Sequence, residues 1–205
     1  MLSVSHLSFA YSGKNILDDL TFDVATGEIV ALWGPNGVGK TTLIKVLAGI
    51  YLPRKGRIVA DGVDSADSPL RYRRQLGYMG DAFPLYGDMT VRDFLYHRAR
   101  LKGEKIIRVR YRVREACKDC NLDEIAKTSI RFLSQGQRKR VALADAILLR
   151  PRLLLLDDVV AGIDDESRES VISVLKTVSA TSTIMVTGHE RECLSKFVTR
   201  FMEFE

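Results

Sequence analysis

One stretch of the sequence has the residue types and the spacing needed to hold phosphate. Residues 34–41, Gly-Pro-Asn-Gly-Val-Gly-Lys-Thr, fit the pattern G-x-x-x-x-G-K-[ST] of a phosphate-binding loop. The glycines let backbone N–H groups curl around an anion, and the start of a following helix adds partial positive charge. In such a loop Lys40 would reach the β- and γ-phosphates of a nucleoside triphosphate, and the Thr41 hydroxyl would ligate Mg²⁺.

Two acids and a histidine follow later apolar segments. Asp157 and Asp158 come after four leucines, and His189 comes just after the apolar run 182–187. Ligands bind at the C-terminal ends of the strands in open α/β sheets. We therefore expect Asp157 to be a second Mg²⁺ ligand, because unpaired buried carboxylates are costly. Asp158 would lie beside the γ-phosphate, where a water must be activated, and His189 would contact the same phosphate.

The segments around these residues are typical of an α/β core. Residues 28–33, 152–157 and 182–187 are short apolar runs that predict buried parallel strands. Apolar spacing predicts a helix over 42–48, closed by Gly49, and an amphipathic helix over 167–178. The phosphate loop would thus lie between a strand and a helix, as its chemistry requires.

The rest of the chain predicts additions to that core. Residues 2–9 and 20–24 alternate apolar and polar side chains, which indicates two flanking antiparallel strands with a turn over 11–15. Tyr11, in that turn, could stack on an adenine ring. From about 90 to 145 the pattern is helical and charged, with Thr90 as a helix cap. This stretch predicts a helical lobe inserted into the core.

Composition is that of an ordinary globular protein, with 46% hydrophobic, 28% charged and 8% aromatic residues in 205. No window approaches the roughly 20 apolar residues of a membrane span, and the start lacks the pattern of a signal peptide. We therefore expect a cytoplasmic location.

Two local features have alternative interpretations. Cys117 and Cys120 form a lone C-x-x-C with no second pair or histidines nearby, so incidental helix cysteines are favoured over a zinc site. Residues 108–114 carry four arginines, which could face nucleic acid or lipid headgroups. No aromatic stacking set is interleaved with them, so we expect a solvated helix face and no nucleic-acid partner.

Residues 133–137, Leu-Ser-Gln-Gly-Gln, open a predicted helix upstream of Asp157. They resemble the signature of the ATP-binding-cassette (ABC) family, usually Leu-Ser-Gly-Gly-Gln. Tyr11, the phosphate loop, the loop near Asp81, Ile163-Asp164 and His189 follow the family order too. The resemblance therefore covers essentially the whole chain.

The resemblance implies a P-loop NTPase fold with a mostly parallel sheet, an N-terminal antiparallel β region and an inserted α-helical lobe. It implies a single ABC ATP-binding domain over 1–205, with the core at about 1–81 and 146–205 and the helical lobe at about 82–145. The implied cofactors are ATP and Mg²⁺.

In this family the signature of one subunit closes on the ATP held by the phosphate loop of another. Ser134 and Gly136, at a helix N-terminus, form a second anion site. The working unit would then be a dimer of this chain, or of this chain and a paralogue, around the nucleotide. The residues expected to bind ATP are Tyr11, Gly34, Pro35, Asn36, Gly37, Val38, Gly39, Lys40, Thr41, Thr42, Ser134, Gly136 and Gln137. The expected metal ligands are Thr41, Asp81 and Asp157, and the expected catalytic residues are Lys40, Asp158 and His189.

The implied function is that of an ATPase subunit of an ABC transporter. ATP binding would close the dimer and Mg²⁺-dependent hydrolysis would reopen it. Transmembrane subunits on other chains would dock near Asp81 and around 83–94, holding this subunit at the cytoplasmic face of the membrane.

Four departures from the family pattern affect the expected turnover. Asp158 stands where the family usually has Glu, and a carboxylate misplaced by about 1 Å can cost about 10²-fold in rate. Asp81 aligns with a Gln that contacts Mg²⁺ and the transmembrane partner. Gln135 replaces the first signature glycine, and Val159-Val160 replaces Pro-Thr or Pro-Ser. We expect retained ATP binding and slow hydrolysis.

Two alternatives belong to other functional classes. One is a soluble ABC ATPase acting on DNA, ribosomes or cofactor assembly, although the chain has neither a long coiled coil nor a second cassette. The other is a regulatory cassette that binds ATP, switches shape and hydrolyses slowly, which Asp158 favours.

Overall fold

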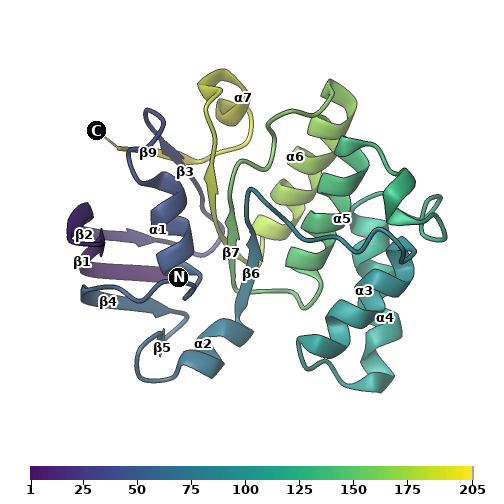
Figure 1. Cartoon of the computed structure of the whole chain (residues 1–205), viewed down its shortest axis with the longest axis horizontal. Coiled ribbons are helices and arrows are strands. Elements are labelled where there is room, and N and C mark those ends of the chain that lie inside the picture. Colours follow the sequence, from purple (N-terminus) through teal and green to yellow (C-terminus); the bar gives the residue numbers. More distant parts are fainter. Residues whose placement is uncertain (205) are drawn as a thin grey trace.

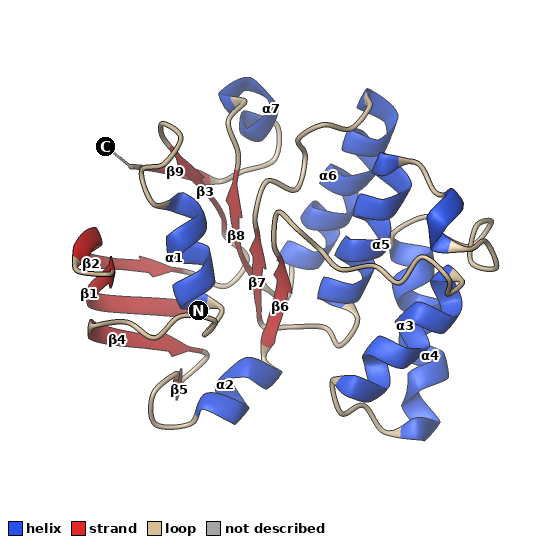
Figure 2. Cartoon of the chain, viewed as in Figure 1, coloured by secondary structure: helices blue, strands red, loops and turns tan. Residues whose placement is uncertain are grey.

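The computed structural model describes residues 1–204 as a stack of layers (Figures 1 and 2). An antiparallel sheet and a parallel sheet lie on either side of helix α1, and the remaining long helices cover the far side of the parallel sheet. The strands are β1 Leu2–Tyr11, β2 Lys14–Val24, β3 Ile29–Trp33, β4 Lys55–Ala60, β5 Val63–Asp64, β6 Leu76–Met79, β7 Leu153–Leu156, β8 Thr183–Thr187 and β9 Arg200–Glu203. The helices are α1 Lys40–Leu47, α2 Pro69–Arg74, α3 Val91–Leu101, α4 Ile106–Asp119, α5 Gln135–Ile147, α6 Asp165–Ser179 and α7 Arg191–Ser195, with a 3₁₀ turn at Ile130–Phe132.

The parallel sheet has the order β6-β7-β8-β3-β9. Strands β3, β7 and β8 confirm the three buried parallel strands that the apolar runs predicted. Because β7 pairs in parallel with β8, and β8 with β3, their C-terminal ends meet at one edge. Strand β9 and the short helices α2 and α7 were not predicted from the sequence. Among the described residues, no helix combines the length and the apolar character needed to cross a bilayer.

Alternating side chains of the parallel strands pack into two separate apolar cores. In β7, Leu153 and Leu155 face α1 and the antiparallel sheet, whereas Leu154 and Leu156 face the long helices. Strand β3 divides in the same way, with Val30 on the first side. Burial on both faces accounts for the unbroken apolar runs, and it holds the strand ends rigidly at the edge of the sheet.

The N-terminal region differs from the prediction in extent. Four antiparallel strands, in the order β2-β1-β4-β5, form this sheet instead of two. Strand β1 runs through Tyr11 and β2 starts at Lys14, so the turn predicted over 11–15 contains only residues 12 and 13. The pairing of β1 with β2 contains register shifts between Val4 and Ala10.

The segment between the core strands β6 and β7 is helical, as predicted. Thr90 caps α3 by accepting a hydrogen bond from the backbone N–H of Asp93. Helices α3, α4 and α5 pack together, and their buried side chains belong to the same apolar cluster as one face of the parallel sheet. The proposed division into a core and a lobe therefore stays a prediction.

The arginine run lies on α4, whose buried stripe includes Val109 and Val113. Most of its arginines are exposed, and Arg112 is half-buried beside Glu104. This agrees with the predicted solvated helix face. Cys117 lies in α4 and Cys120 caps its C-terminus, and both thiols pack in the apolar core. Burial raises the pKa of Cys117 to about 11, so this thiol stays protonated at neutral pH.

Candidate phosphate-binding site

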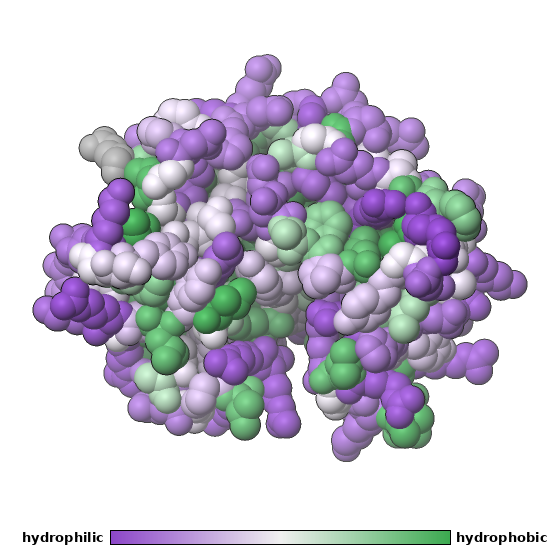
Figure 3. Space-filling model, viewed as in Figure 1, coloured by the Kyte–Doolittle hydropathy of each residue, from purple (hydrophilic) through white to green (hydrophobic). Residues whose placement is uncertain are grey.

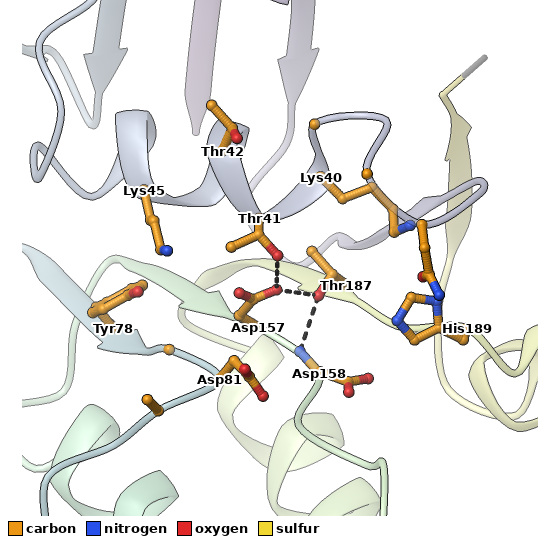
Figure 4. A pocket seen from close by; sticks show the side chains of 15 residues that line it. Lys40, Thr41, Thr42, Lys45, Tyr78, Asp81, Asp157, Asp158, Thr187 and His189 are labelled. Carbon is orange, nitrogen blue, oxygen red and sulfur yellow. Dashed lines mark hydrogen bonds between the residues drawn. The ribbon is translucent and has the colours of Figure 1, made fainter. Parts of the chain in front are cut away.

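A cavity of about 420 Å³ opens at the start of α1, at the edge where the parallel strands end (Figure 4). It brings together predicted residues that are separated by more than 100 positions in the chain. The predicted residues that line it are Asn36, Gly37, Gly39, Lys40, Thr41, Thr42, Asp81, Asp157, Asp158 and His189.

Glycines shape the loop because other chain segments pass very close to it. Gly39 has φ 113° where α1 begins, and a side chain there would press against Ile16 and Leu17 of β2. A Cβ at Gly34 would overlap the backbone carbonyl of Phe204, which follows β9. Gly34, Pro35 and Val38 do not line the cavity. Their predicted part in nucleotide binding stays a prediction.

Lys40 is only 6% exposed, and its ammonium is held by the loop itself. Its Nζ donates to the carbonyl oxygens of Gly34 and Pro35, at 2.7 Å each. Burial lowers the pKa of Lys40, while the nearby charges of Asp157 and Asp158 oppose that shift. The residue is thus a preorganised cation at the mouth of the loop, able to exchange carbonyl partners for phosphate oxygens.

Asp157 meets two threonines at the bottom of the cavity (Figure 4). Its Oδ1 accepts hydrogen bonds from Thr41 Oγ1 at 3.0 Å and from Thr187 Oγ1 at 2.6 Å. Its Oδ2 is buried and has no hydrogen-bond partner among the described residues. Oxygen atoms of this kind suit Mg²⁺, which prefers carboxylate, hydroxyl and water ligands. The residues present therefore fit the metal that the fold implies.

Asp158 occupies an uncommon backbone conformation, with φ 53°. Its N–H donates to Thr187 Oγ1 at 2.9 Å, which ties the residue to β8. Burial raises the pKa of Asp158, and the neighbouring His189 and Lys139 partly counter that effect. Asp158, His189 and Asp81 all line the cavity, so groups able to take up a proton surround the place where phosphate would lie.

Sequence reasoning missed Thr187, which joins both acids. A signal was available, because residues after neighbouring parallel strands lie side by side, and Thr187 is two positions before His189. We expect Thr187→Val to lower the free energy of unfolding by about 1–3 kcal/mol, since the N–H of Asp158 would lose its partner. It should also weaken Mg²⁺-dependent nucleotide binding. Urea unfolding with and without MgATP measures both effects.

Thr183→Val is the matched control for this prediction. Thr183 lies at the other end of β8, is equally buried and donates to the carbonyl of Ala25 at 3.2 Å. Its loss should reduce stability by about 0.5–1.5 kcal/mol and leave nucleotide binding unchanged. Equal effects of the two substitutions on binding would contradict the role given to Thr187.

The signature residues lie at a different place from the phosphate loop. Ser134 caps α5: its Oγ accepts from the N–H of Gln137, and the Gln137 side chain accepts from the N–H of Ser134. Ser134 and Gln137 line a second cavity of about 870 Å³. Four carboxylates and the guanidinium of Arg140 also line it. Gly136 is buried, and any side chain there would overlap Ser167 on α6.

Tyr11 lies outside both cavities. It is 40% exposed and packs edge-to-face against Phe9 and Tyr51, with ring centroids 4.8 and 5.5 Å away. Stacking of Tyr11 on an adenine ring therefore stays a prediction. Tyr78 and Lys45 line the first cavity although sequence reasoning named neither.

Comparison with known proteins agrees with this arrangement. The family model described as ABC transporter matches residues 17–161. The chain is 35% identical to the putrescine transport ATP-binding protein PotG of Escherichia coli (strain K12), covering 95% of this chain and 52% of PotG. It is 36% identical to the SkfA peptide export ATP-binding protein SkfE of Bacillus subtilis (strain 168), covering 86% of this chain and 73% of SkfE. The chain thus spans about half the length of PotG.

Solved structures give the same result. A structure of an ATP-binding subunit of an ABC transporter matches with a TM-score of 0.88 and 29% identity, over 100% of this chain and 86% of that one. CbiO1 from Clostridium perfringens, part of the ABC transporter complex CbiONQ, matches with a TM-score of 0.86 and 26% identity, over 100% of this chain and 84% of CbiO1. The chain belongs to the ABC transporter family and has the fold of its ATP-binding cassettes.

Proposed function

We propose that this chain binds ATP and hydrolyses it with Mg²⁺, as the energy-supplying subunit of an ABC transporter. The observation that carries the proposal is the meeting of Thr41 and Asp157, 3.0 Å apart, in the cavity that Lys40 also lines. A hydroxyl, a carboxylate and an ammonium at the start of a helix are the groups needed to hold a metal–triphosphate. The names of PotG and SkfE, both ATP-binding proteins of transport systems, support it.

Each group in the cavity has a proposed role in hydrolysis. Lys40 would neutralise charge on the β- and γ-phosphates, and Thr41 and Asp157 would hold the metal, with Asp81 at the rim. Bound Mg²⁺ would supply further charge neutralisation on the phosphate oxygens. Asp158 would orient the attacking water and accept its proton, and His189 would contact the γ-phosphate.

We further propose that this chain hydrolyses ATP slowly. Asp158 is one methylene shorter than the glutamate expected from the family resemblance. Its backbone is held by Thr187, so the loop is not free to advance the carboxylate toward the phosphate. This observation favours a cassette that stays closed on ATP for a long time, and it keeps a regulatory role as the second candidate function.

Mg²⁺-dependent release of phosphate from ATP by the purified chain tests the basic proposal. A chelator should stop the reaction, and excess Mg²⁺ should restore it. Co-purification with a multi-span membrane protein would support the transporter role, whereas co-sedimentation with ribosomes would contradict it. A protein that neither binds nor hydrolyses ATP would refute the proposal as a whole.

A groove with apolar and cationic side chains is the proposed docking place for transmembrane subunits. It is a cavity of about 660 Å³ beside the loop from β6 to α3, lined by Phe83, Leu85 and Leu133 and also by Arg131 and Arg138. Hydrophobic residues gather on the viewed face over this loop (Figure 3). Docking there would attach the chain to the cytoplasmic face of a membrane, and membership of CbiO1 in a multi-subunit complex supports such partners.

The dimer part of the proposal rests on two cavities that lie apart on one chain. Ser134 lines one of them and Lys40 the other, so two subunits are needed to bring both groups to one triphosphate. We expect Ser134→Asp to weaken ATP-dependent dimerisation at least about 10-fold, because a like charge would face the phosphates. Aspartate is as good a helix cap as serine, so α5 should stay intact. Light scattering with MgATP measures the change.

Ser134→Thr is the control, because it keeps both the helix cap and a neutral hydroxyl. It should dimerise nearly as the wild type does. ATP binding to the monomer should be the same in both variants, since Ser134 does not line the phosphate-loop cavity. Unchanged dimerisation of Ser134→Asp would remove the basis for a shared site.

A further inference from the structure

A lysine with no role so far is buried beside the acidic turn that follows β7. Lys139 lies on α5 and is only 8% exposed. Its Nζ donates to the carbonyl oxygen of Asp158 at 2.8 Å and also to that of Ala161. Burial lowers the pKa of Lys139. Burying a cation costs free energy unless hydrogen bonds or an opposite charge compensate for it. The two hydrogen bonds of Lys139 therefore suggest a role for this residue.

The turn that receives these bonds carries Asp158 in its left-handed conformation. Such a backbone is strained and persists only where its surroundings hold it. Thr187, from β8, accepts the N–H of Asp158, and Lys139, from α5, donates to its carbonyl. The peptide groups on both sides of Asp158 are therefore fixed, one by the sheet and one by a helix.

We propose that Lys139 is a positioning residue that fixes the direction of the Asp158 carboxylate in the phosphate-loop cavity. Lys139 touches no phosphate-binding residue in the described hydrogen bonds, and it acts through the backbone of the turn. The inference rests on the proposed function, because Asp158 matters to turnover only if the chain hydrolyses ATP.

The position of Lys139 on α5 has a second consequence. The same helix begins after Ser134, about one and a half turns earlier. Lys139 therefore connects the helix that Ser134 caps to the turn that carries Asp158.

A purely structural role makes different predictions from a positioning role. If Lys139 only supports the fold, its loss should reduce stability, ATP affinity and turnover together. If it positions Asp158, its loss should lower kcat at saturating ATP and leave the Kd for MgATP nearly unchanged. The effect should also need the Asp158 carboxylate, because only that group is misdirected.

Lys139→Met and Lys139→Arg in the full chain test these alternatives. Methionine fills the space without donors, and we expect kcat to fall about 10-fold, as for a misplacement of less than 1 Å. The Kd should change by less than about 2-fold, and arginine, which can donate to both carbonyls, should restore most of the rate. Single-turnover rates in an Asp158→Asn background should show no further loss from Lys139→Met.

Hydrogen exchange without nucleotide gives a readout independent of activity. The backbone amides of 158–162 should exchange faster in Lys139→Met, while those of β8 should not change. Unaltered kcat or unaltered exchange in this variant, or an equal rate loss in the Asp158→Asn background, would each overturn the inference. If Lys139→Met does not fold, Lys139→Gln serves in the same double-mutant cycle. A wild-type chain without ATPase activity would refute the proposed function, whereas unchanged exchange alone would refute the role of Lys139.

Discussion

Lys40→Ala is expected to remove ATP binding and hydrolysis almost completely, with a loss of turnover of at least about 10³-fold. The expectation follows from charge, because a triphosphate in this cavity meets Asp81, Asp157 and Asp158. Lys40 is the cation whose ammonium already lies against the loop backbone, 2.7 Å from two of its carbonyls. Removing several kcal/mol of charge stabilisation from a partly desolvated site corresponds to a loss of this size.

Stability without nucleotide should change far less in the same variant. Burial lowers the pKa of Lys40, so its charged form is disfavoured in the folded protein. Loss of two hydrogen bonds to the loop is thus offset by removal of a buried charge. ATP at 100 times its Kd should stabilise the wild type by about 2.7 kcal/mol, or about 5–10 °C in Tm. That shift should be absent in Lys40→Ala.

Lys45→Ala is the matched control, since Lys45 lies on the same helix and lines the same cavity. It loses the same charge, but it makes no hydrogen bond to the loop among the described contacts. We expect a loss of ATP affinity of about 10-fold or less. Equal losses of ATP affinity in the two variants would mean that Lys40 acts only through its charge and not through its position in the loop. Full activity of Lys40→Ala would contradict the assignment of the site.

The predictable parts of the site are those that short sequence patterns identify. The phosphate loop has a fixed sequence motif, and Asp157 and His189 follow apolar strands whose ends must meet at one edge of a parallel sheet. Thr187 could have been found by the same rule, because it ends the strand next to Asp157. The capping box of Ser134 and Gln137 is likewise a short-range pattern.

The parts that were missed depend on contacts between distant segments. Lys139 donates to a turn about twenty residues further along the chain. The spacing of apolar and polar residues along α5 does not predict that its ammonium is buried. Gly34 is required by Phe204, and Gly136 by Ser167. Each of these glycines also fits its motif, so the sequence alone could not separate packing against another segment from approach to a phosphate.

Asp158→Glu should raise kcat about 10- to 100-fold, and it is the substitution that tests slow turnover most directly. The added methylene would carry the carboxylate about 1 Å further into the cavity, a distance that can matter about 10²-fold. Glutamate is less suited than aspartate to the left-handed backbone of residue 158. The hydrogen bonds of this backbone with Thr187 and Lys139 should still hold it in that conformation. The strain should lower the free energy of unfolding by about 1 kcal/mol.

Asp158→Asn separates the effect of charge from the effect of reach. Asparagine keeps the size of aspartate and tolerates the left-handed conformation equally well. Without a carboxylate to accept the proton of water, hydrolysis should fall about 10²-fold below the wild type, with MgATP binding retained. Pre-steady-state and steady-state phosphate release from the three proteins, at saturating MgATP, measures the series.

The order of rates distinguishes the two proposed functions. Glutamate above aspartate above asparagine would mean that residue 158 is the hydrolytic acid and that its shorter side chain limits turnover, as a slowly cycling or regulatory cassette requires. A fast wild type that gains nothing from glutamate would show that the clamped turn already delivers the shorter carboxylate correctly, and an ordinary transport ATPase would then be the better interpretation. Equal rates for aspartate and asparagine would move the hydrolytic role to another group that lines the cavity, such as His189 or Asp81.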